Sequence, residues 1–171
     1  LLILKGSSMT TQVHLEPSSD HAQVRLIASD GIDWIPYALI PNTFFRVLHV
    51  DETNNIVILN FKMPPWTRTP VHGHHCTATA YTLEGQWSYD SLDFNQGDIA
   101  YETTVEVHQP FTRENGAILL TTLIGGAGND RLLEDHNEDG TTTLLRTRLF
   151  KAFERISLTE AAKIDFASLV N

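Results

Sequence analysis

Short runs of apolar residues, divided by turn residues, fill the chain up to about residue 147. The runs FFRVLHV (44–50), NIVILNFK (55–62) and AILLTTLI (117–124) are rich in β-branched and aromatic residues, which are enriched in strands. Further strands are predicted over 77–83, 86–91, 131–135 and 141–147, with turns at 84–85, 95–98 and 138–140. Many short strands at this spacing are typical of a sandwich or a barrel, so we predict an all-β fold.

The end of the chain has a different pattern. Ser157 and Glu160 form a capping-box sequence ahead of the segment AAKIDFASLV, which predicts one short C-terminal helix over about 158–169. Met9 followed by Thr-Thr-Gln resembles a natural start, so residues 1–8 are set aside. We therefore divide the chain into three parts: an N-terminal segment (1–16), one barrel domain (17–150) and a helical tail (151–171). The N-terminal segment is expected to be extended, or to include residues that are not part of the natural sequence.

Charge and cysteine content narrow the classes of protein to consider. The net charge is −9, which argues against binding to nucleic acid or to an anionic membrane. The chain has one cysteine, Cys76, so no internal disulfide can form and a cytoplasmic protein is expected. No apolar run approaches the ~20 residues of a transmembrane helix.

Histidines gather in the segment VHGHHC, which holds three of the eight in the chain. His72 and His74 would point to one face of a strand and His75 to the other, because side chains alternate along a strand. The predicted strands and turns that follow can return the chain beside this segment at His108. The three residues His72, His74 and His108 could then form a cluster that binds a metal ion.

The remaining histidines and the cysteine carry weaker signals. Cys76 could be a soft metal ligand or only a small residue at the start of the next strand. His49 is expected to be a hydrogen-bonded strand residue and His136 to be exposed in a polar hairpin, while His14 and His21 indicate nothing.

The phrases VHGHH, YTLEG and GDIAYETTVEVH resemble the two motifs of the cupin superfamily over roughly residues 30–150. This resemblance implies a single-domain jelly-roll barrel, a double-stranded β-helix, with a short C-terminal helix. The phrases AYTLEGQWSY and DWIP are most similar to the group of acetylacetone dioxygenase and 2,4′-dihydroxyacetophenone dioxygenase. These small enzymes cleave C–C bonds beside carbonyl groups with Fe(II) held by three histidines.

One departure from the common cupin pattern bears on the metal ligands. The glutamate expected four or five residues after His-x-His is replaced by Ala78 and Thr79. The resemblance therefore implies three histidine ligands, His72, His74 and His108. Three neutral imidazoles leave the full charge of the metal for a bidentate anionic substrate. Fe(II) is the expected metal, with Zn, Ni or Mn as alternatives because imidazole binds many metals.

The resemblance also implies a carboxylate near the metal, and Glu102 is the candidate, six residues before His108. It could hold a ligand imidazole or take the acidic proton of the substrate. Glu106 has the same strand parity as His108 and is the rival, and a solvated surface glutamate is the plain alternative for Glu102.

The expected function is that of an Fe(II)-dependent dioxygenase acting with O₂ on a small diketone or aryl hydroxyketone, which the metal chelates as its enolate. One alternative is a non-enzymatic zinc-binding cupin sensor, and another is an isomerase or hydrolase that uses the same site as a Lewis acid. A homo-oligomer, dimer or tetramer, is expected because open sheet edges are often covered by a neighbouring subunit.

Several other side chains are open candidates for the substrate pocket. One or two of the aromatic residues are expected to face the metal, the candidates being Trp34, Phe61, Tyr81, Trp87, Tyr89 and Phe111. Arg46, Arg68 or Arg113 could pair with an anionic substrate. The glycine-rich segment 125–128 lacks the Lys-Ser/Thr of a phosphate-binding loop and is predicted to be a turn.

Overall fold

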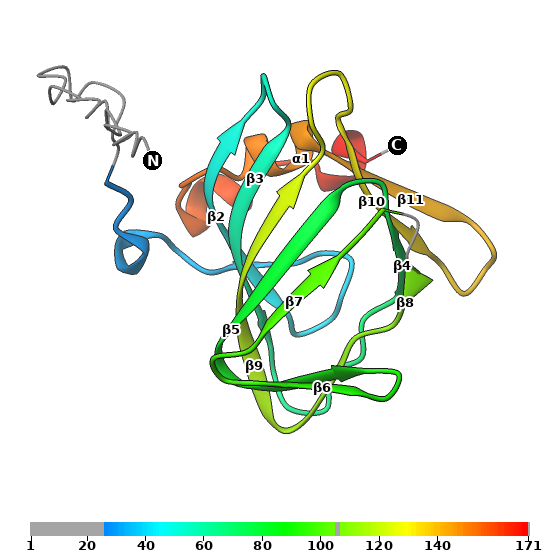
Figure 1. Ribbon diagram of the computed structural model, residues 1–171. Coiled ribbons are helices and arrows are strands. Elements are labelled where there is room, and N and C mark those ends of the chain that lie inside the picture. Colours follow the sequence, from blue (N-terminus) through cyan, green and yellow to red (C-terminus); the bar gives the residue numbers. More distant parts are fainter. Residues whose placement is uncertain (1–25, 105–106, 171) are drawn as a thin grey trace, which may run out of the picture.

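The apolar strands of the sequence form two antiparallel sheets that close around a common interior (Figure 1). The structure is a computed structural model that describes residues 26–104 and 107–170. The expectations for residues 1–16, for His14 and His21 and for Glu106 lie outside these described residues. The arrangement is the jelly-roll barrel of a single-domain cupin, as the sequence predicts.

The larger sheet has seven strands in the order β1-β2-β3-β9-β5-β6, with β7 also paired to β5. Its strands are β1 (Ile35–Pro36), β2 (Phe44–Asp51), β3 (Ile56–Met63), β5 (Thr77–Tyr89), β6 (Leu92–Asn95), β7 (Ile99–Glu102) and β9 (Phe111–Ile124). The three runs of β-forming residues in the sequence become β2, β3 and the second half of β9. The predicted turn before Ile99 is confirmed, since the Asp98 amide donates to the Asn95 carbonyl over 2.9 Å.

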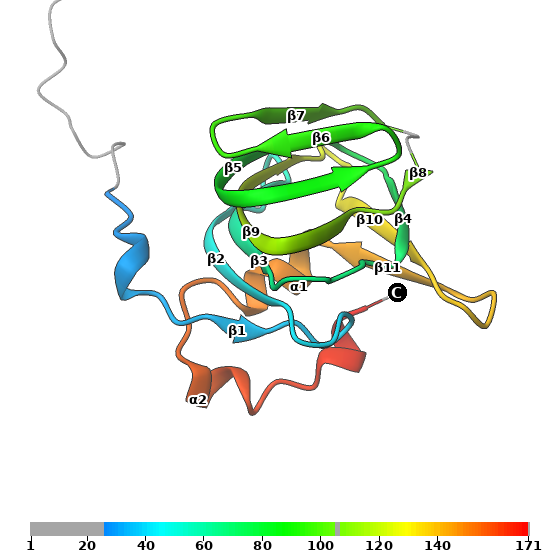
Figure 2. The same cartoon turned by 90° about the horizontal axis from the view of Figure 1, so that it is seen from below.

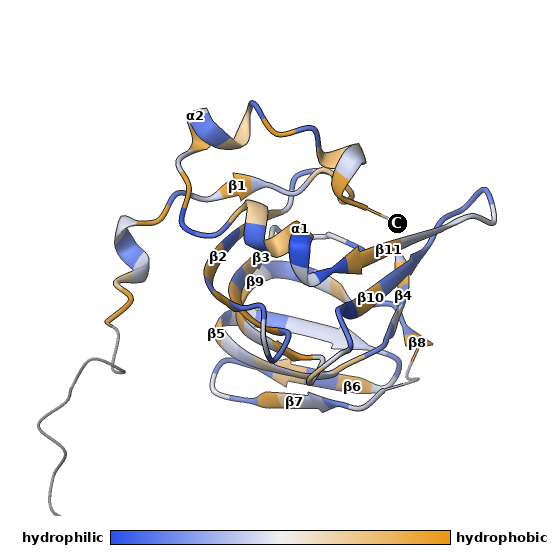
Figure 3. Cartoon of the chain, turned by 90° about the horizontal axis from the view of Figure 1, so that it is seen from above, coloured by the Kyte–Doolittle hydropathy of each residue, from blue (hydrophilic) through white to orange (hydrophobic). Residues whose placement is uncertain are grey.

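The smaller sheet has four strands in the order β11-β10-β4-β8. Its strands are β4 (Val71–His74), β8 (Val107–His108), β10 (Arg131–His136) and β11 (Thr142–Arg146). The predicted Asp139-Gly140 hairpin joins β10 to β11, and its largely hydrophilic loop projects from the barrel (Figure 3). His136 is exposed there, as expected.

The prediction of a tight turn at Glu84-Gly85 is wrong, because the chain runs through both residues as one strand, β5. Gly85 instead lies at an irregular point of the β5–β9 ladder, where the register shifts between Thr82 and Glu84 and again between Gly85 and Trp87. Its φ is +76°, and a Cβ on Gly85 would lie 2.1 Å from the backbone oxygen of Gly116. A positive φ is the signature of a turn and of a β-bulge alike.

The prediction of a single C-terminal helix over 158–169 is also wrong. The chain forms α1 (Thr147–Ala152), which the sequence analysis assigned in part to a strand, then α2 (Leu158–Ala161) and a 3₁₀ turn (Phe166–Leu169). The capping box at Ser157 and Glu160 is present and begins α2. These short elements lie beside β1 and β2 on one side of the barrel (Figure 2).

The buried side chains form two clusters. The larger cluster joins the C-terminal elements to the barrel, and Phe45 on β2 packs edge-to-face on Phe153 with ring centroids 5.2 Å apart. The smaller cluster lies around Trp87, Met63 and Leu119. Phe61 packs against both clusters, so the interior is continuous between the C-terminal side and the wall near Trp87.

Glu154, just after α1, links the C-terminal elements to β2. Its carboxylate lies 3.1 Å from His49 Nδ1, accepts a hydrogen bond from the Val50 amide over 3.1 Å and accepts one from Lys151 over 2.8 Å. The expectation of a hydrogen-bonded His49 is thus confirmed. Burial acts to raise the pKa of Glu154, but the hydrogen bonds from Lys151, Val50 and His49 outweigh it and lower this pKa.

We expect Glu154→Ala to lower the free energy of unfolding by about 1–3 kcal/mol, because the Val50 amide loses its partner. Since the folded-state pKa of Glu154 is lowered, its contribution is present above the ordinary pKa of 4.5 and fades as the pH falls below it. Urea unfolding at pH 7 and pH 4 measures both effects. Glu52→Ala, which removes an exposed partner of Lys151 at 3.6 Å, is the control and should change stability by less than about 0.5 kcal/mol.

No helix in the described part of the chain has both the length and the apolar character needed to cross a membrane.

The outer face of β7 carries the exposed side chains of Ile99 and Tyr101, which are 61% and 67% exposed. The homo-oligomer expected from open sheet edges stays a prediction.

Candidate metal centre

The four strands of the smaller sheet place His72, His74 and His108 on one face. His72 and His74 alternate along β4, and His108 on β8 lies directly opposite His72 in the antiparallel register. Residues opposite one another on paired strands share a face. The His-Gly-His spacing on β4 therefore places His72 and His74 on one face. The return of the chain through β7 to β8 then adds His108 to that face.

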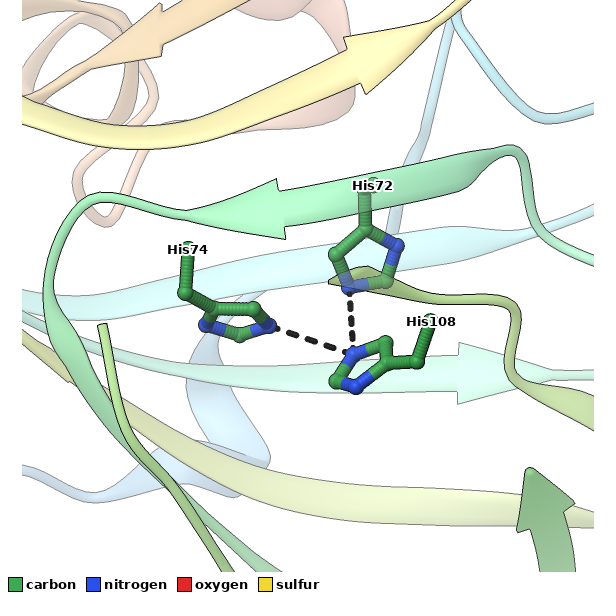
Figure 4. A group of neighbouring side chains, drawn as sticks. All are labelled: His72, His74 and His108. Atoms are coloured by element: carbon green, nitrogen blue, oxygen red, sulfur yellow. Dashed lines mark hydrogen bonds between the residues drawn. The ribbon is translucent and has the colours of Figure 1, made fainter. Parts of the chain in front are cut away.

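The Nε2 atoms of the three imidazoles converge on one point (Figure 4). His108 Nε2 lies 3.0 Å from His72 Nε2 and 3.2 Å from His74 Nε2. The potential ligand atoms of the three residues all lie within 4.8 Å of one another. His74 and His108 are buried, and His72 is half-buried.

This set of donor atoms fits a metal ion better than it fits hydrogen bonds among the histidines. Each Nε2 carries at most one hydrogen when the imidazole is neutral, so His108 cannot donate to both neighbours. His72 Nδ1 lies 3.3 Å from the Pro70 carbonyl oxygen, which can only accept, so this contact favours the tautomer with its proton on Nδ1 and with the Nε2 lone pair toward the cluster. A cation of the kind that imidazole binds would satisfy all three nitrogens at once.

The electrostatics of the cluster favour the neutral form of His72 and His74. Burial, followed by the charges of His108 and then His74, lowers the pKa of His72 to about 3. Burial, followed by the same effect of His108, lowers the pKa of His74 to about 4. Neutral imidazole is the form that binds metals.

Glu102, the predicted carboxylate, reaches the cluster from the larger sheet. Its Oε1 lies 3.6 Å from His108 Nε2 and its Oε2 lies 3.7 Å from His74 Nε2. Glu102 is 4% exposed and lies opposite Ala78 in the β5–β7 register. Ala78 is one of the two positions at which the common cupin pattern has its glutamate, so a carboxylate approaches the same region from a different strand.

The other candidate ligands lie away from the cluster. His75 points to the outer face, where its Nε2 lies 3.3 Å from Glu134 Oε2. Cys76 is buried in the larger apolar cluster, and burial raises the pKa of its thiol to about 12. Cys76 therefore has the surroundings of an inert core residue.

A cavity of about 120 Å³ opens beside the three histidines and Glu102. Its walls are mainly apolar, and of the predicted aromatic residues only Phe61 and Trp87 line it. Tyr89 is not among the lining residues, but its ring stacks on His108 with centroids 4.5 Å apart. An apolar cavity of about 150 Å³ binds benzene in another protein, so this one suits a small organic ligand.

The remaining predicted pocket residues lie elsewhere. Tyr81 is exposed, Trp34 lies beneath the Arg46 guanidinium at 4.5 Å, and Phe111 lies beneath Arg68 at 5.0 Å. No arginine or lysine of the described residues lines the cavity. An anionic substrate would therefore find its positive charge at the metal.

Two polar side chains of the cavity wall, Tyr37 and Asp135, were not predicted from the sequence. Asp135 has the same strand parity as the apolar Leu133 in the run LLEDH. An acid at the parity of the half-buried Leu133 was the available signal. Tyr37 lies just after the short strand β1, where no periodic pattern could place it.

Comparison with known proteins agrees with this architecture. A profile of the ChrR cupin-like domain matches residues 22–125. A search of curated proteins finds no match.

Solved structures with the same fold include a cupin-like protein of unknown function from Ralstonia eutropha JMP134, at 22% identity over 75% of this chain and 80% of that one, with a TM-score of 0.63. A candidate acetylacetone dioxygenase from Methylibium petroleiphilum PM1 has 14% identity over 72% of this chain and 89% of that one, with a TM-score of 0.62. An acetylacetone dioxygenase from Acinetobacter johnsonii has 11% identity over 98% and 99% of the two chains, with a TM-score of 0.56. At these identities the likeness is one of fold.

Proposed function

The chain belongs to the family of ChrR cupin-like domains, and we propose that it is a metal-dependent dioxygenase that cleaves a C–C bond next to a carbonyl group. The substrates are O₂ and a small diketone or aryl hydroxyketone, bound as its enolate. One observation carries the proposal. Three imidazoles converge at a largely apolar cavity, with the carboxylate of Glu102 beside their Nε2 atoms.

In this proposal His72, His74 and His108 hold the metal through their Nε2 atoms, with Fe(II) as the preferred ion and Zn, Ni or Mn as alternatives. Fe(II) bound there would supply positive charge for the enolate oxygens and electrons for the reduction of O₂. Because all three ligands are neutral, they cancel none of the metal charge. The site therefore favours a substrate that brings its own negative charge.

Glu102 is the proposed base. A diketone or hydroxyketone must lose one proton to become a bidentate anion, and general bases in proteins act within hydrogen-bonding reach of that proton. Glu102 lies beside two of the three ligand nitrogens and is buried, so it faces the place where the substrate oxygens would sit. Its burial keeps bulk water from competing for the same proton.

The apolar wall has a separate task in this proposal. Phe61, Met63, Trp87 and Leu119 line the cavity and would contact the carbon skeleton of the substrate. Trp87 is fixed in place because its Nε1 donates to Thr82 Oγ1 over 2.9 Å. A fixed apolar wall orients a small substrate and excludes water from the reacting oxygens.

A second candidate function is a zinc-binding cupin module without oxygen chemistry, which the match to the ChrR cupin-like domain favours. The same three histidines would hold zinc tightly and Glu102 would be a structural neighbour. An isomerase or hydrolase that uses the bound metal as a Lewis acid is the third alternative, and it would work with zinc as well as with iron.

Oxygen uptake separates these functions. Protein loaded anaerobically with Fe(II) should consume O₂ in the presence of one or more small β-diketones or aryl hydroxyketones, and zinc-loaded protein should not. Glu102→Gln should lower the rate about 100-fold or more, as loss of a general base does, with the metal content unchanged. Glu134→Gln, a change on the outer face beside His75, is the matched control and should keep the rate.

Conversion of the substrate by zinc-loaded protein, without oxygen uptake, would instead support the Lewis-acid alternative. Absence of any conversion across the panel, in protein that retains zinc from its host cell, would favour the sensor alternative.

A further inference from the structure

Asp135 lies on the cavity wall next to the three histidines. In the β4–β10 register Asp135 is opposite His72, and Leu133 is opposite His74. Opposite residues of an antiparallel pair share a face, and all four of these residues line the cavity. Asp135 therefore belongs to the same wall as two of the proposed ligands, one strand away.

The carboxyl group of Asp135 is buried without a full set of partners. Asp135 is 6% exposed, and its Oδ2 has no hydrogen-bond partner among the described residues. No lysine or arginine of the described residues lines the cavity to neutralise it. Burial raises the pKa of Asp135 to about 6, and burial followed by the charge of Asp135 raises the pKa of Tyr37.

An acid in this position is costly for the fold. A buried polar group without a partner destabilises a protein by about 1–3 kcal/mol, more when it is charged. Most buried polar groups in proteins are paired, so a carboxyl group that lines a cavity and has an unpaired oxygen indicates a partner that arrives with the ligand. That partner must donate a hydrogen bond, since a carboxylate can only accept.

We infer that Asp135 binds a hydroxyl group of the substrate, one other than the oxygen pair that the metal binds. The substrate class is thereby narrowed from small diketones and aryl hydroxyketones to those that carry a further hydroxyl group. A plain aliphatic β-diketone would leave Asp135 buried and unpaired, and the cavity would discriminate against it. This inference rests on the proposed function, because it adds a recognition contact to the same cavity.

The test compares two ligands that differ by one hydroxyl group, 2,4′-dihydroxyacetophenone and 2-hydroxyacetophenone. Binding to zinc-loaded protein is measured by calorimetry, so that the readout does not depend on oxygen chemistry. The wild-type protein should bind the dihydroxy ligand about tenfold more tightly or better, since a hydrogen bond to a charged group is worth that much. Asp135→Leu should abolish this preference and leave binding of the monohydroxy ligand within about threefold.

Thermal unfolding of the metal-free protein gives a second readout. Asp135→Leu and Asp135→Asn should keep or raise the melting temperature, because both remove a buried carboxylate that lacks a partner. A structural role for Asp135 predicts a lower melting temperature for both variants. Glu134→Leu, next to Asp135 but on the outer face with His75, is the control and should retain the ligand preference.

Two results would overturn the inference alone. These are equal affinity of the wild-type protein for the two ligands and a preference that survives in Asp135→Leu. Absence of binding by both ligands to zinc-loaded and iron-loaded wild-type protein would overturn the proposed function, and the inference with it.

Discussion

Replacing His108 by alanine is expected to remove most of the bound metal and to leave the fold intact. His108 Nε2 lies within 3.2 Å of both other proposed ligand atoms, so its loss leaves two imidazoles on one strand. Changes around a metal site lower affinity 10–100-fold even when they only affect the residues that orient the ligands. Loss of a ligand itself should therefore weaken binding by more than about 100-fold.

The fold should survive because His108 contributes little to the apolar clusters. Its main packing partner is Tyr89, whose ring stacks on it, and such a pair is worth about 0.5–1.5 kcal/mol. Metal analysis after dialysis and circular dichroism measure the two effects. His75→Ala, on the outer face of the same sheet, is the matched control and should retain the metal. Full metal retention in His108→Ala would rule out the three-histidine site.

The second large effect is expected from Gly85→Ala, which should destabilise the protein by about 3 kcal/mol or more. Alanine at the positive φ of Gly85 costs about 1–2 kcal/mol, and its Cβ would lie 2.1 Å from the Gly116 oxygen. The obstacle is backbone, so it cannot swing aside as a side chain can, and forced backbone shifts add about 1–3 kcal/mol. A loss of this size should lower the melting temperature by roughly 10 °C.

Gly97→Ala separates the cost of the positive φ from the cost of the steric contact with backbone. Gly97 also has a positive φ, +93°, but no atom lies within 4 Å of the position of its Cβ. Its replacement should therefore show the conformational cost alone, about 1–2 kcal/mol. Equal melting temperatures for the two variants would show that the contact between Gly85 and Gly116 does not constrain the barrel.

Much of the fold follows from local pattern, and the two wrong predictions have different causes. The β-branched runs, the Asp139-Gly140 hairpin and the capping box at Ser157 are decided by neighbours in sequence. Gly85 has the same local signature in a turn and in a bulge, and the choice depends on Gly116, which is remote in sequence. The C-terminal helix fails for a local reason, since the Asp165 side chain accepts a hydrogen bond from the Ala167 amide and so begins a separate turn.

The site residues likewise divide into those that could be predicted from the sequence and those that could not. Strand alternation predicts that His72 and His74 share a face and that His75 does not. The predicted strands and turns after His75 made His108 a candidate, the resemblance to cupins implied His108 as a ligand and added Glu102, and the structure brings both to the cluster. Asp135 was missed because its place on the wall depends on the register between β10 and β4. Burial of an acid cannot be deduced until that register is known.

The position of His75 on the outer face has a consequence for how the chain acquires its metal. In the unfolded chain His72, His74 and His75 are three imidazoles within four residues, and all of them can bind the same ion. Folding removes His75 from this set and replaces it with His108. A metal ion that also binds the unfolded chain stabilises the native state by less than its native affinity implies. Excess metal during synthesis would thus hold the nascent segment in a chelate that must open before β4 can pair with β8.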